Sequence, residues 1–285
     1  MTQVSALLAL VAALCLSACS KAPSPKKAQR EATRRVISLA PSLTEWVYEL
    51  GAQGDLVARS ARCDQPPEAL TKPSAGGLFP PDLELILSFK PSDALMIEGH
   101  EVFKGTLTRF GVKVHTLQPS TLSDLWGLVE ELGVILDRRE ASRRWIEGAQ
   151  AELQASLKRA PARSASPPKV LIEVWPKPLS VAGAESFMGD LVRIAGGQPV
   201  PKGLGAWPQL PLESLVTLNP DVIFVSSPQR VAELLSPDAP RAWRALSAIQ
   251  AGRVYAREGK LERPNPSLIQ ELSWLTERLH QPAQR

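Results

Sequence analysis

Two segments decide the fold that we predict: "DLELILSFKP" at residues 82–91 and "PLESLVTLNP" at residues 211–220. In each, a Leu-Glu pair stands ahead of a proline with mostly apolar residues between them. Glu84 and Glu213 are 129 residues apart, and Pro91 and Pro220 are separated by the same 129 residues. A constant separation across a whole pattern indicates one structural unit that is used twice.

The residues around each copy alternate between strand-like and helix-like runs. Ahead of the first copy, residues 36–39 predict a strand, and residues 46–50 predict a helix that Ser42 or Thr44 caps. The loop at 63–81 is too rich in proline and glycine for regular structure. Further strands are predicted at residues 55–59, 92–97, 112–117, 169–175, 221–227 and 253–257, with Asp82 capping a short helix at 83–88. Strands that alternate with helices indicate parallel sheets built from βαβ units.

A long helix is predicted between the two copies, because residues 120–160 contain no proline. From about Asp137 to Ala160 the chain would form one rod of roughly 36 Å. The apolar residues that recur at helical spacing are Ile146, Ala149, Leu153 and Leu157. The predicted fold class is therefore α/β, with two Rossmann-like lobes, each on a central parallel sheet, joined by one long backbone helix. We expect a ligand cleft between the lobes and little hinge motion.

The amino terminus has the pattern of a bacterial secretory signal. Residues 1–18 are uncharged and largely apolar, and "LSAC" at residues 16–19 resembles a lipobox, which implies cleavage before Cys19 and lipidation of its thiol. No Lys or Arg precedes the apolar run, so an ordinary signal with a coincidental Cys is the other interpretation. The predicted organisation is a lipoprotein signal peptide at 1–18, a lipid-anchored flexible tether at 19–34, an N-terminal α/β lobe at 35–120, a connecting helical segment at 121–165 and a C-terminal α/β lobe at 166–285.

Charge and motifs argue against several classes of function. The formal net charge is +4, but the basic residues gather at 21–35, so the rest of the chain is close to neutral and no nucleic-acid partner is expected. The sequence holds no G-x-S-x-G, H-E-x-x-H or P-loop motif, and we expect no enzymatic activity. No cluster of three or four ligands predicts a metal site, and no cofactor is expected. Cys63 has no partner in the predicted mature chain and is expected to be a buried small hydrophobe.

Four segments carry a resemblance to a known family: "RVISLAPSLTE" at 35–45, "CDQPPEA" at 63–69, "LELILSFKPS" at 83–92 and "AWPQLPLESLVTLNPDVIFV" at 206–225. Together with the lipobox and the long helix, they resemble the helical-backbone class of periplasmic substrate-binding proteins of ABC importers. The "AWPQ" segment favours the vitamin B12 (cobalamin) branch of that class. The resemblance implies a monomeric, lipid-anchored extracytoplasmic protein of a bacterial membrane that delivers cobalamin or a related corrinoid to a permease dimer. Haem or a ferric siderophore is the alternative ligand, and a sensor or enzyme on the same fold is a remote one.

The resemblance also assigns roles to individual residues. Family members carry one exposed glutamate on each lobe that meets arginines of the permease, and by position these are Glu84 and Glu213. A glutamate in the first turn of a helix also favours the helix dipole, which is the structural interpretation of the same residues.

The ligand pocket implied by the family has aromatic walls and a few neutral hydrogen-bonding groups. Trp207 matches a pocket tryptophan, Gln209 lies beside it, and Trp175 ends a strand that faces the cleft, whereas Trp46 is expected in the core. The chain departs from the cobalamin pattern where it has Arg62, Leu78 and Ser180 or Leu179 in place of aromatics, and Arg62 suits an anionic ligand group. The remaining candidates are Phe79, as a substitute aromatic, and His100, as a group near the metal of a ligand.

Overall fold

The computed structural model describes residues 34–159, 166–257 and 263–281. The predicted signal peptide, the predicted tether up to residue 33 and the candidate lipidation site Cys19 lie outside the described residues. Within those ranges, no helix is long and apolar enough to cross a membrane. The structure below is that of the compact unit that begins at Arg35.

The first lobe is built on a four-stranded parallel sheet. Its order is β2-β1-β3-β4, and each neighbouring pair is parallel. The strands are β1 (Val36–Ser38), β2 (Leu56–Arg59), β3 (Asp93–Met96) and β4 (Lys113–Thr116). The helices of this lobe are α3 (Pro41–Glu49), α4 (Leu83–Ser88) and α5 (Glu101–Arg109), with a 3-10 helix η1 at Pro67–Thr71.

The second lobe is built on a mixed sheet of order β6-β5-β8-β9, with β7 pairing with β5. Only the β5–β6 pair is antiparallel, because a tight turn at Lys177 and Pro178 sends the chain straight back. The strands are β5 (Lys169–Pro176), β6 (Leu179–Val181), β7 (Gln198–Pro199), β8 (Val222–Val225) and β9 (Val254–Ala256). The helices are α8 (Phe187–Ile194), α9 (Leu212–Leu218), α10 (Pro228–Leu235), α11 (Arg241–Arg244), α12 (Ser247–Gln250) and α13 (Leu268–His280). The predicted fold of two α/β lobes is confirmed.

The repeated sequence segment folds in the same way in both lobes. Helices α4 and α9 begin 129 residues apart, and so do strands β3 and β8. Between helix and strand, Lys90 at φ 47° and Asn219 at φ 38° both adopt the left-handed conformation. Ile86 and Leu215 are fully buried at matching positions. The repeat in the sequence is therefore a repeated helix–turn–strand unit.

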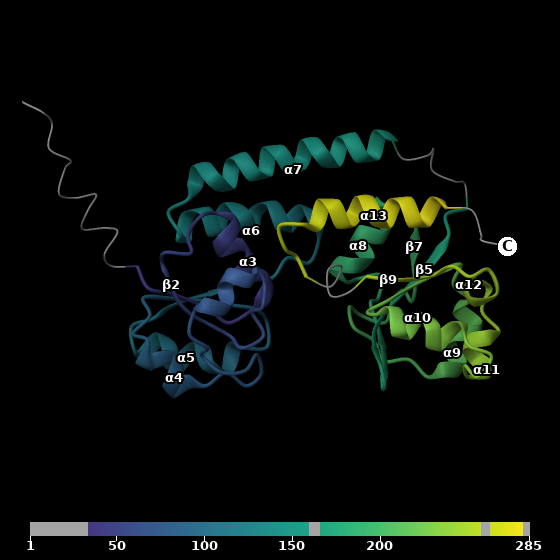
Figure 1. Cartoon of the computed structure of the whole chain (residues 1–285), viewed down its shortest axis with the longest axis horizontal. Coiled ribbons are helices and arrows are strands. Elements are labelled where there is room, and N and C mark those ends of the chain that lie inside the picture. Colours follow the sequence, from purple (N-terminus) through teal and green to yellow (C-terminus); the bar gives the residue numbers. More distant parts are fainter. Residues whose placement is uncertain (1–33, 160–165, 258–262, 282–285) are drawn as a thin grey trace, which may run out of the picture. The chain divides into compact units, whose positions relative to one another are not determined.

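A helical hairpin connects the lobes. Helix α6 (Leu122–Ile135) ends before Asp137, whose φ of 57° turns the chain, and helix α7 (Arg139–Arg159) then runs back over it. Figure 1 shows one end of α7 above α6 and the other above α13, and α7 contacts both helices. The predicted apolar face of the long helix is confirmed, since its four residues Ile146, Ala149, Leu153 and Leu157 pack into the core.

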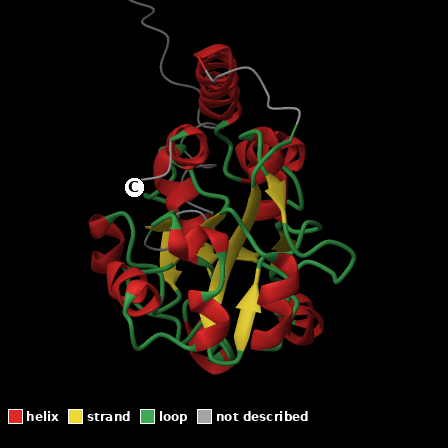
Figure 2. Ribbon diagram, turned by 90° about the vertical axis from the view of Figure 1, so that its right-hand side faces the viewer, coloured by secondary structure: helices red, strands yellow, loops and turns green. Residues whose placement is uncertain are grey.

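The interior holds one large hydrophobic cluster that both lobes share. It contains residues of β1 and α3 from the first lobe, of α6 and α7, and of β5, β8, α8 and α13 from the second. Each sheet packs a smaller hydrophobic cluster against its other face. Figure 2 shows the strands in the interior with helices on both sides, as expected for parallel sheets that are buried on both faces.

Two local predictions were wrong. Helix α3 has Ala40 at its N-cap, with no side chain bonding to a free backbone amide, because Pro41 already occupies the first helical position. Thr44 lies inside the helix, and its hydroxyl donates to Ser38 Oγ at 2.8 Å. The loop at 63–81 does contain regular structure, the short 3-10 helix η1.

Candidate functional site

A cavity of about 570 Å³ lies at the carboxyl ends of the first sheet. Each of its four strands delivers residues to the lining where the strand ends, which is the usual ligand position in open α/β sheets. Strand β1 leads to residues 40–42, β2 to Arg62, β3 to Ile97 and Glu98, and β4 to residues 117–120. The fold of the first lobe therefore positions one whole wall of the cavity.

The opposite wall comes from the second lobe. Trp175 near the end of β5, the residues 185–188 at the start of α8, and Trp207 in the following loop all line the cavity. Arg263 and Pro264, which precede α13, complete it. Ser186 caps α8 by accepting a 3.0 Å hydrogen bond from the Gly189 amide, so this wall is held by regular helix geometry.

Two glycines allow the second wall to pack closely. A Cβ atom on Gly183 would lie 2.0 Å from the carbonyl oxygen of Gly205, and one on Gly189 would lie 2.6 Å from the carbonyl oxygen of Gly183. Any larger residue would push these backbones apart. The loop that carries Trp207 and the start of α8 therefore reach their positions only because both residues are glycine.

The cavity presents charges of both signs. Arg62 and Arg263 contribute guanidinium groups, while Glu98 and Glu185 contribute carboxylates. Arg263 lies 3.8 Å from Asp64 and 3.9 Å from Glu45. By contrast, the exposed guanidinium of Arg62 forms no hydrogen bond or ion pair with the part of the chain that the structure describes. Arg62 is therefore the cation most available to a ligand.

Half of the predicted ligand-binding residues lie on the cavity wall: Trp207, Trp175, Arg62 and Leu78. Although they line a cavity, Trp175 is 61% exposed and Trp207 is 50% exposed. Core tryptophans of this chain behave differently, since Trp46 is fully buried as predicted. Two large apolar rings left open at a concave site are typical of a surface that a ligand covers.

The other four predicted residues do not line this cavity. Gln209 and Ser180 lie side by side, joined by an antiparallel β-bridge. Phe79 packs against His100 with the ring centroids 4.4 Å apart. His100 is completely buried, and its Nε2 donates a 2.7 Å hydrogen bond to the carbonyl oxygen of Leu78. In this structure His100 therefore supports the backbone of a cavity residue and does not face the cavity.

Several lining residues were missed by sequence reasoning, among them Gln118, Ser120, Ser186 and Arg263. Gln118 and Ser120 follow β4, a strand that the sequence does predict, so the rule that ligands bind at strand ends would have found them. Ser186 carried a helix-capping signal ahead of an apolar run. Arg263 carried no signal, because it reaches the cavity through the packing of the distant helix α13.

The two glutamates of the repeat occupy equivalent positions. Glu84 is the second residue of α4 and Glu213 the second residue of α9, and both are exposed. Neither carboxylate forms a hydrogen bond or ion pair with the described residues. Their side chains are thus available to a partner.

Neither a metal centre nor a reactive thiol emerges from the described residues. Among them, no group of three or more His, Cys, Asp or Glu side chains is placed to bind a metal ion. Cys63 is fully buried beside the cavity residue Arg62, and burial raises the pKa of its thiol above the ordinary value. This environment is typical of a packed, unreactive cysteine.

Comparison with known proteins finds similarity to periplasmic binding proteins. A family model described as periplasmic binding protein matches residues 36–260. A vitamin B12-binding protein of Pectobacterium carotovorum is 28% identical over 245 residues, which cover 83% of this chain and 84% of the relative. The crystal structure of the periplasmic vitamin B12 binding protein of Vibrio cholerae superimposes with a TM-score of 0.77 at 25% identity, covering 86% of this chain and 96% of that one. A periplasmic haem-binding protein from Roseiflexus sp. RS-1 superimposes with the same TM-score at 23% identity, covering 88% and 99%, and so shares the fold.

Proposed function

Because the chain belongs to the periplasmic binding protein family, we propose that it binds cobalamin or a related corrinoid and delivers it to an ABC importer. The observation that carries this proposal is the pair of solvent-exposed tryptophans, Trp175 and Trp207, that line the cavity between the lobes. Relatives named vitamin B12-binding protein support the same ligand.

The chemistry of the cavity suits a corrin ring. A corrinoid is a flat and largely apolar disc fringed by amides, and flat apolar surface stacks well on aromatic rings. Neutral hydrogen-bonding side chains for the amide fringe are available from Ser42, Gln118 and Ser120 on the first-lobe wall. Leu78 and Ile97 add apolar surface beside them.

A second ligand class is favoured by one specific observation. The guanidinium of Arg62, which has no partner among the described residues, is matched to a carboxylate, which haem and many ferric siderophores carry and the amide fringe of a corrin lacks. Arg263 lies on the same cavity, although Asp64 and Glu45 already stand near it. Haem or a ferric siderophore is therefore the alternative ligand.

We propose that Glu84 and Glu213 dock the protein onto the two subunits of the permease. A pseudo-symmetric pair of exposed carboxylates fits a symmetric pair of receptors, and arginine can bind a carboxylate through two hydrogen bonds. The proposal is supported by their equal position on α4 and α9 and by their exposure. The lipobox-like sequence at Cys19 supports anchoring of the mature protein to a membrane on its extracytoplasmic side.

An optical experiment tests the ligand. The purified protein is incubated separately with cyanocobalamin, haemin and a ferric siderophore and is then desalted, so that only bound chromophore stays with the protein. We expect the corrinoid spectrum to be retained at about one equivalent, and Trp207→Ala to reduce the retention. Retention of haem or siderophore alone would replace the first proposal with the alternative, and retention of none would contradict both.

A further inference from the structure

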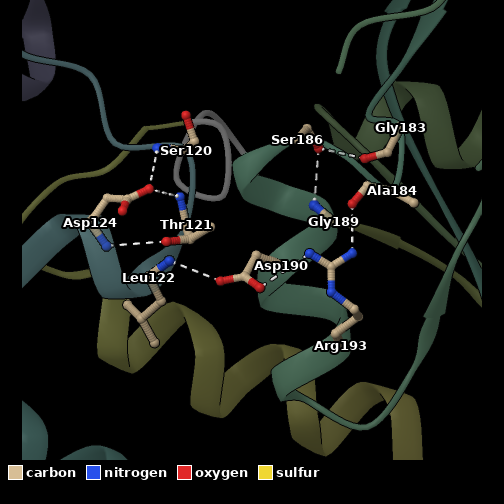
Figure 3. A network of polar contacts seen from close by, with 10 residues as sticks. All are labelled: Ser120, Thr121, Leu122, Asp124, Gly183, Ala184, Ser186, Gly189, Asp190 and Arg193. Atoms are coloured by element: carbon tan, nitrogen blue, oxygen red, sulfur yellow. Dashed lines mark hydrogen bonds and ion pairs between the residues drawn. The ribbon is translucent and has the colours of Figure 1, made fainter. Parts of the chain in front are cut away.

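The carboxylate of Asp190 forms a hydrogen bond between the helices that lead into the two walls of the cavity. Asp190 in α8 accepts a 2.9 Å hydrogen bond from the backbone amide of Leu122, the first residue of α6. Figure 3 shows the Asp190 side chain between the start of α6 and the side chain of Arg193. The two bonded residues are 68 positions apart and belong to different elements of the fold.

This bond is not needed for capping either helix. Helix α6 has its own capping box, in which Thr121 and Asp124 bond each other's backbone amides at 3.1 and 2.9 Å. Helix α8 is capped by Ser186. The first amide of a helix has no partner within the helix, and a carboxylate there also meets the positive end of the helix dipole. Asp190 thus adds a charge-assisted link between two helices that are already complete.

The carboxylate of Asp190 is held in place by Arg193. Its second oxygen accepts a 3.2 Å hydrogen bond from Arg193, whose other terminal nitrogen donates to the carbonyl oxygen of Ala184 at 2.6 Å. The Asp190 side chain is only 18% exposed. An anchored and largely shielded side chain loses little freedom when it makes its bond, so the link has a defined geometry.

Both ends of the link lead directly into cavity residues. Pro119 and Ser120 stand just before Leu122, and the lining residues 185–188 stand just before Asp190. We propose that Asp190 is a positioning residue that fixes the separation of these two walls, and so holds the ligand site in its binding form. The effect on affinity rests on the proposed ligand-binding function, whereas the effect on the walls does not. Preorganisation of this kind raises affinity because ordering costs are met before the ligand arrives.

Two variants and one matched control test the inference. Asp190→Ala removes the link, and Asp190→Asn keeps an oxygen that accepts from Leu122 while it loses the charge. The control is Asp82→Ala, which removes a carboxylate that caps α4 at 3.0 Å, away from the cavity. Amide hydrogen exchange is measured on the ligand-free, full-length folded protein, and the dissociation constants for cyanocobalamin and haemin are measured in parallel.

We expect Asp190→Ala to speed exchange about tenfold in both wall segments, 117–125 and 184–194, with Asp190→Asn between it and the wild type. The same variant should weaken ligand binding by about tenfold, and Asp82→Ala should change neither quantity by more than twofold. The inference would be overturned if exchange in Asp190→Ala were faster in neither segment, or faster in α6 alone. It would also be overturned if the wild type binds a probe and Asp190→Ala binds it with the same affinity. A wild-type protein that binds neither probe contradicts the proposed function instead, and the exchange of the two segments then decides the role of Asp190.

Discussion

The indole nitrogen of Trp46 donates a 2.7 Å hydrogen bond to the carbonyl oxygen of Pro264, 218 residues further along the chain. Trp46 is fully buried in α3, and its ring meets the ring of Trp145 edge to face at a centroid distance of 4.5 Å. Pro264 lines the cavity. The long helix α7, the first lobe and the cavity segment before α13 are therefore connected through one side chain.

Trp46→Phe should destabilise the protein by about 1–3 kcal/mol, because the buried ring becomes smaller and the Pro264 carbonyl loses its donor. Urea unfolding followed by circular dichroism measures the change. Trp126→Phe serves as the control, since the centroid of Trp126 lies 6.1 Å from that of Trp145 and Trp126 makes no hydrogen bond with the described residues. Equal losses in the two variants would contradict the importance of the bond.

Arg230→Met should cost about 3 kcal/mol of the free energy of unfolding. Arg230 forms two hydrogen bonds to Glu173, of 2.7 and 2.8 Å, and Glu173 is only 1% exposed, so the variant leaves a buried carboxylate unpaired. The same pairing raises the pKa of Arg230. Urea unfolding tests the variant beside the double variant Glu173→Met, Arg230→Met, which should recover most of the loss. A single variant within 1 kcal/mol of the wild type would refute the argument.

Reversal of both docking charges, Glu84→Lys with Glu213→Lys, should abolish uptake in cells while the purified protein keeps its ligand affinity within twofold. Both residues are exposed and lie off the cavity, so their reversal should disrupt the proposed contacts to the permease without disturbing the site. The matched control reverses two exposed glutamates of α7, Glu147 and Glu152. Normal uptake by the docking variant would show that these carboxylates do not dock the protein.

Trp207→Ala should weaken ligand binding by about tenfold, because truncating a large aromatic at the centre of a site commonly costs more than 1 kcal/mol. Titration followed by the absorbance of the bound ligand gives the dissociation constant. The control is Phe110→Ala, which removes an aromatic that is 67% exposed and does not line the cavity. An unchanged affinity in the Trp207 variant would remove this ring from the site.

Cys63 should make stability depend on pH in the alkaline range. Its thiol has a pKa raised by burial above the ordinary value near 9, so the unfolded chain ionises first and stability falls as the pH rises past that value. We expect the free energy of unfolding of the wild type, compared with that of Cys63→Ala, to drop by about 1 kcal/mol between pH 7 and pH 10. Parallel curves for the two proteins would contradict a raised pKa.

Local signals in the sequence predicted the elements well where they were unambiguous. Helix α4 begins at Leu83 and ends at Ser88 as predicted, because Asp82 caps it by accepting from Leu85 and Pro91 stands just beyond it. The cap of α3 was mispredicted because the proline at its first position offers no amide that needs a partner. Helix boundaries can thus be predicted from the sequence where the capping residue has only one available role.

The site was predictable in part, for a physical reason. Trp175 lies near the end of β5, and Arg62 and the residues after β4 follow strands, so their place at the sheet edge is a consequence of topology. The inward or outward direction of His100 and the arrival of Arg263 depend on tertiary packing between distant segments. Spacing along the chain carries no information about such contacts.

The hydrophobic cluster that spans both lobes has a consequence for how the molecule melts. Buried residues as distant as Val36, Leu132 and Leu275 belong to one continuous hydrophobic cluster that both lobes share. Heating should therefore produce one calorimetric transition whose van't Hoff and calorimetric enthalpies agree. Either half expressed alone would expose this interior to water and would be prone to aggregation.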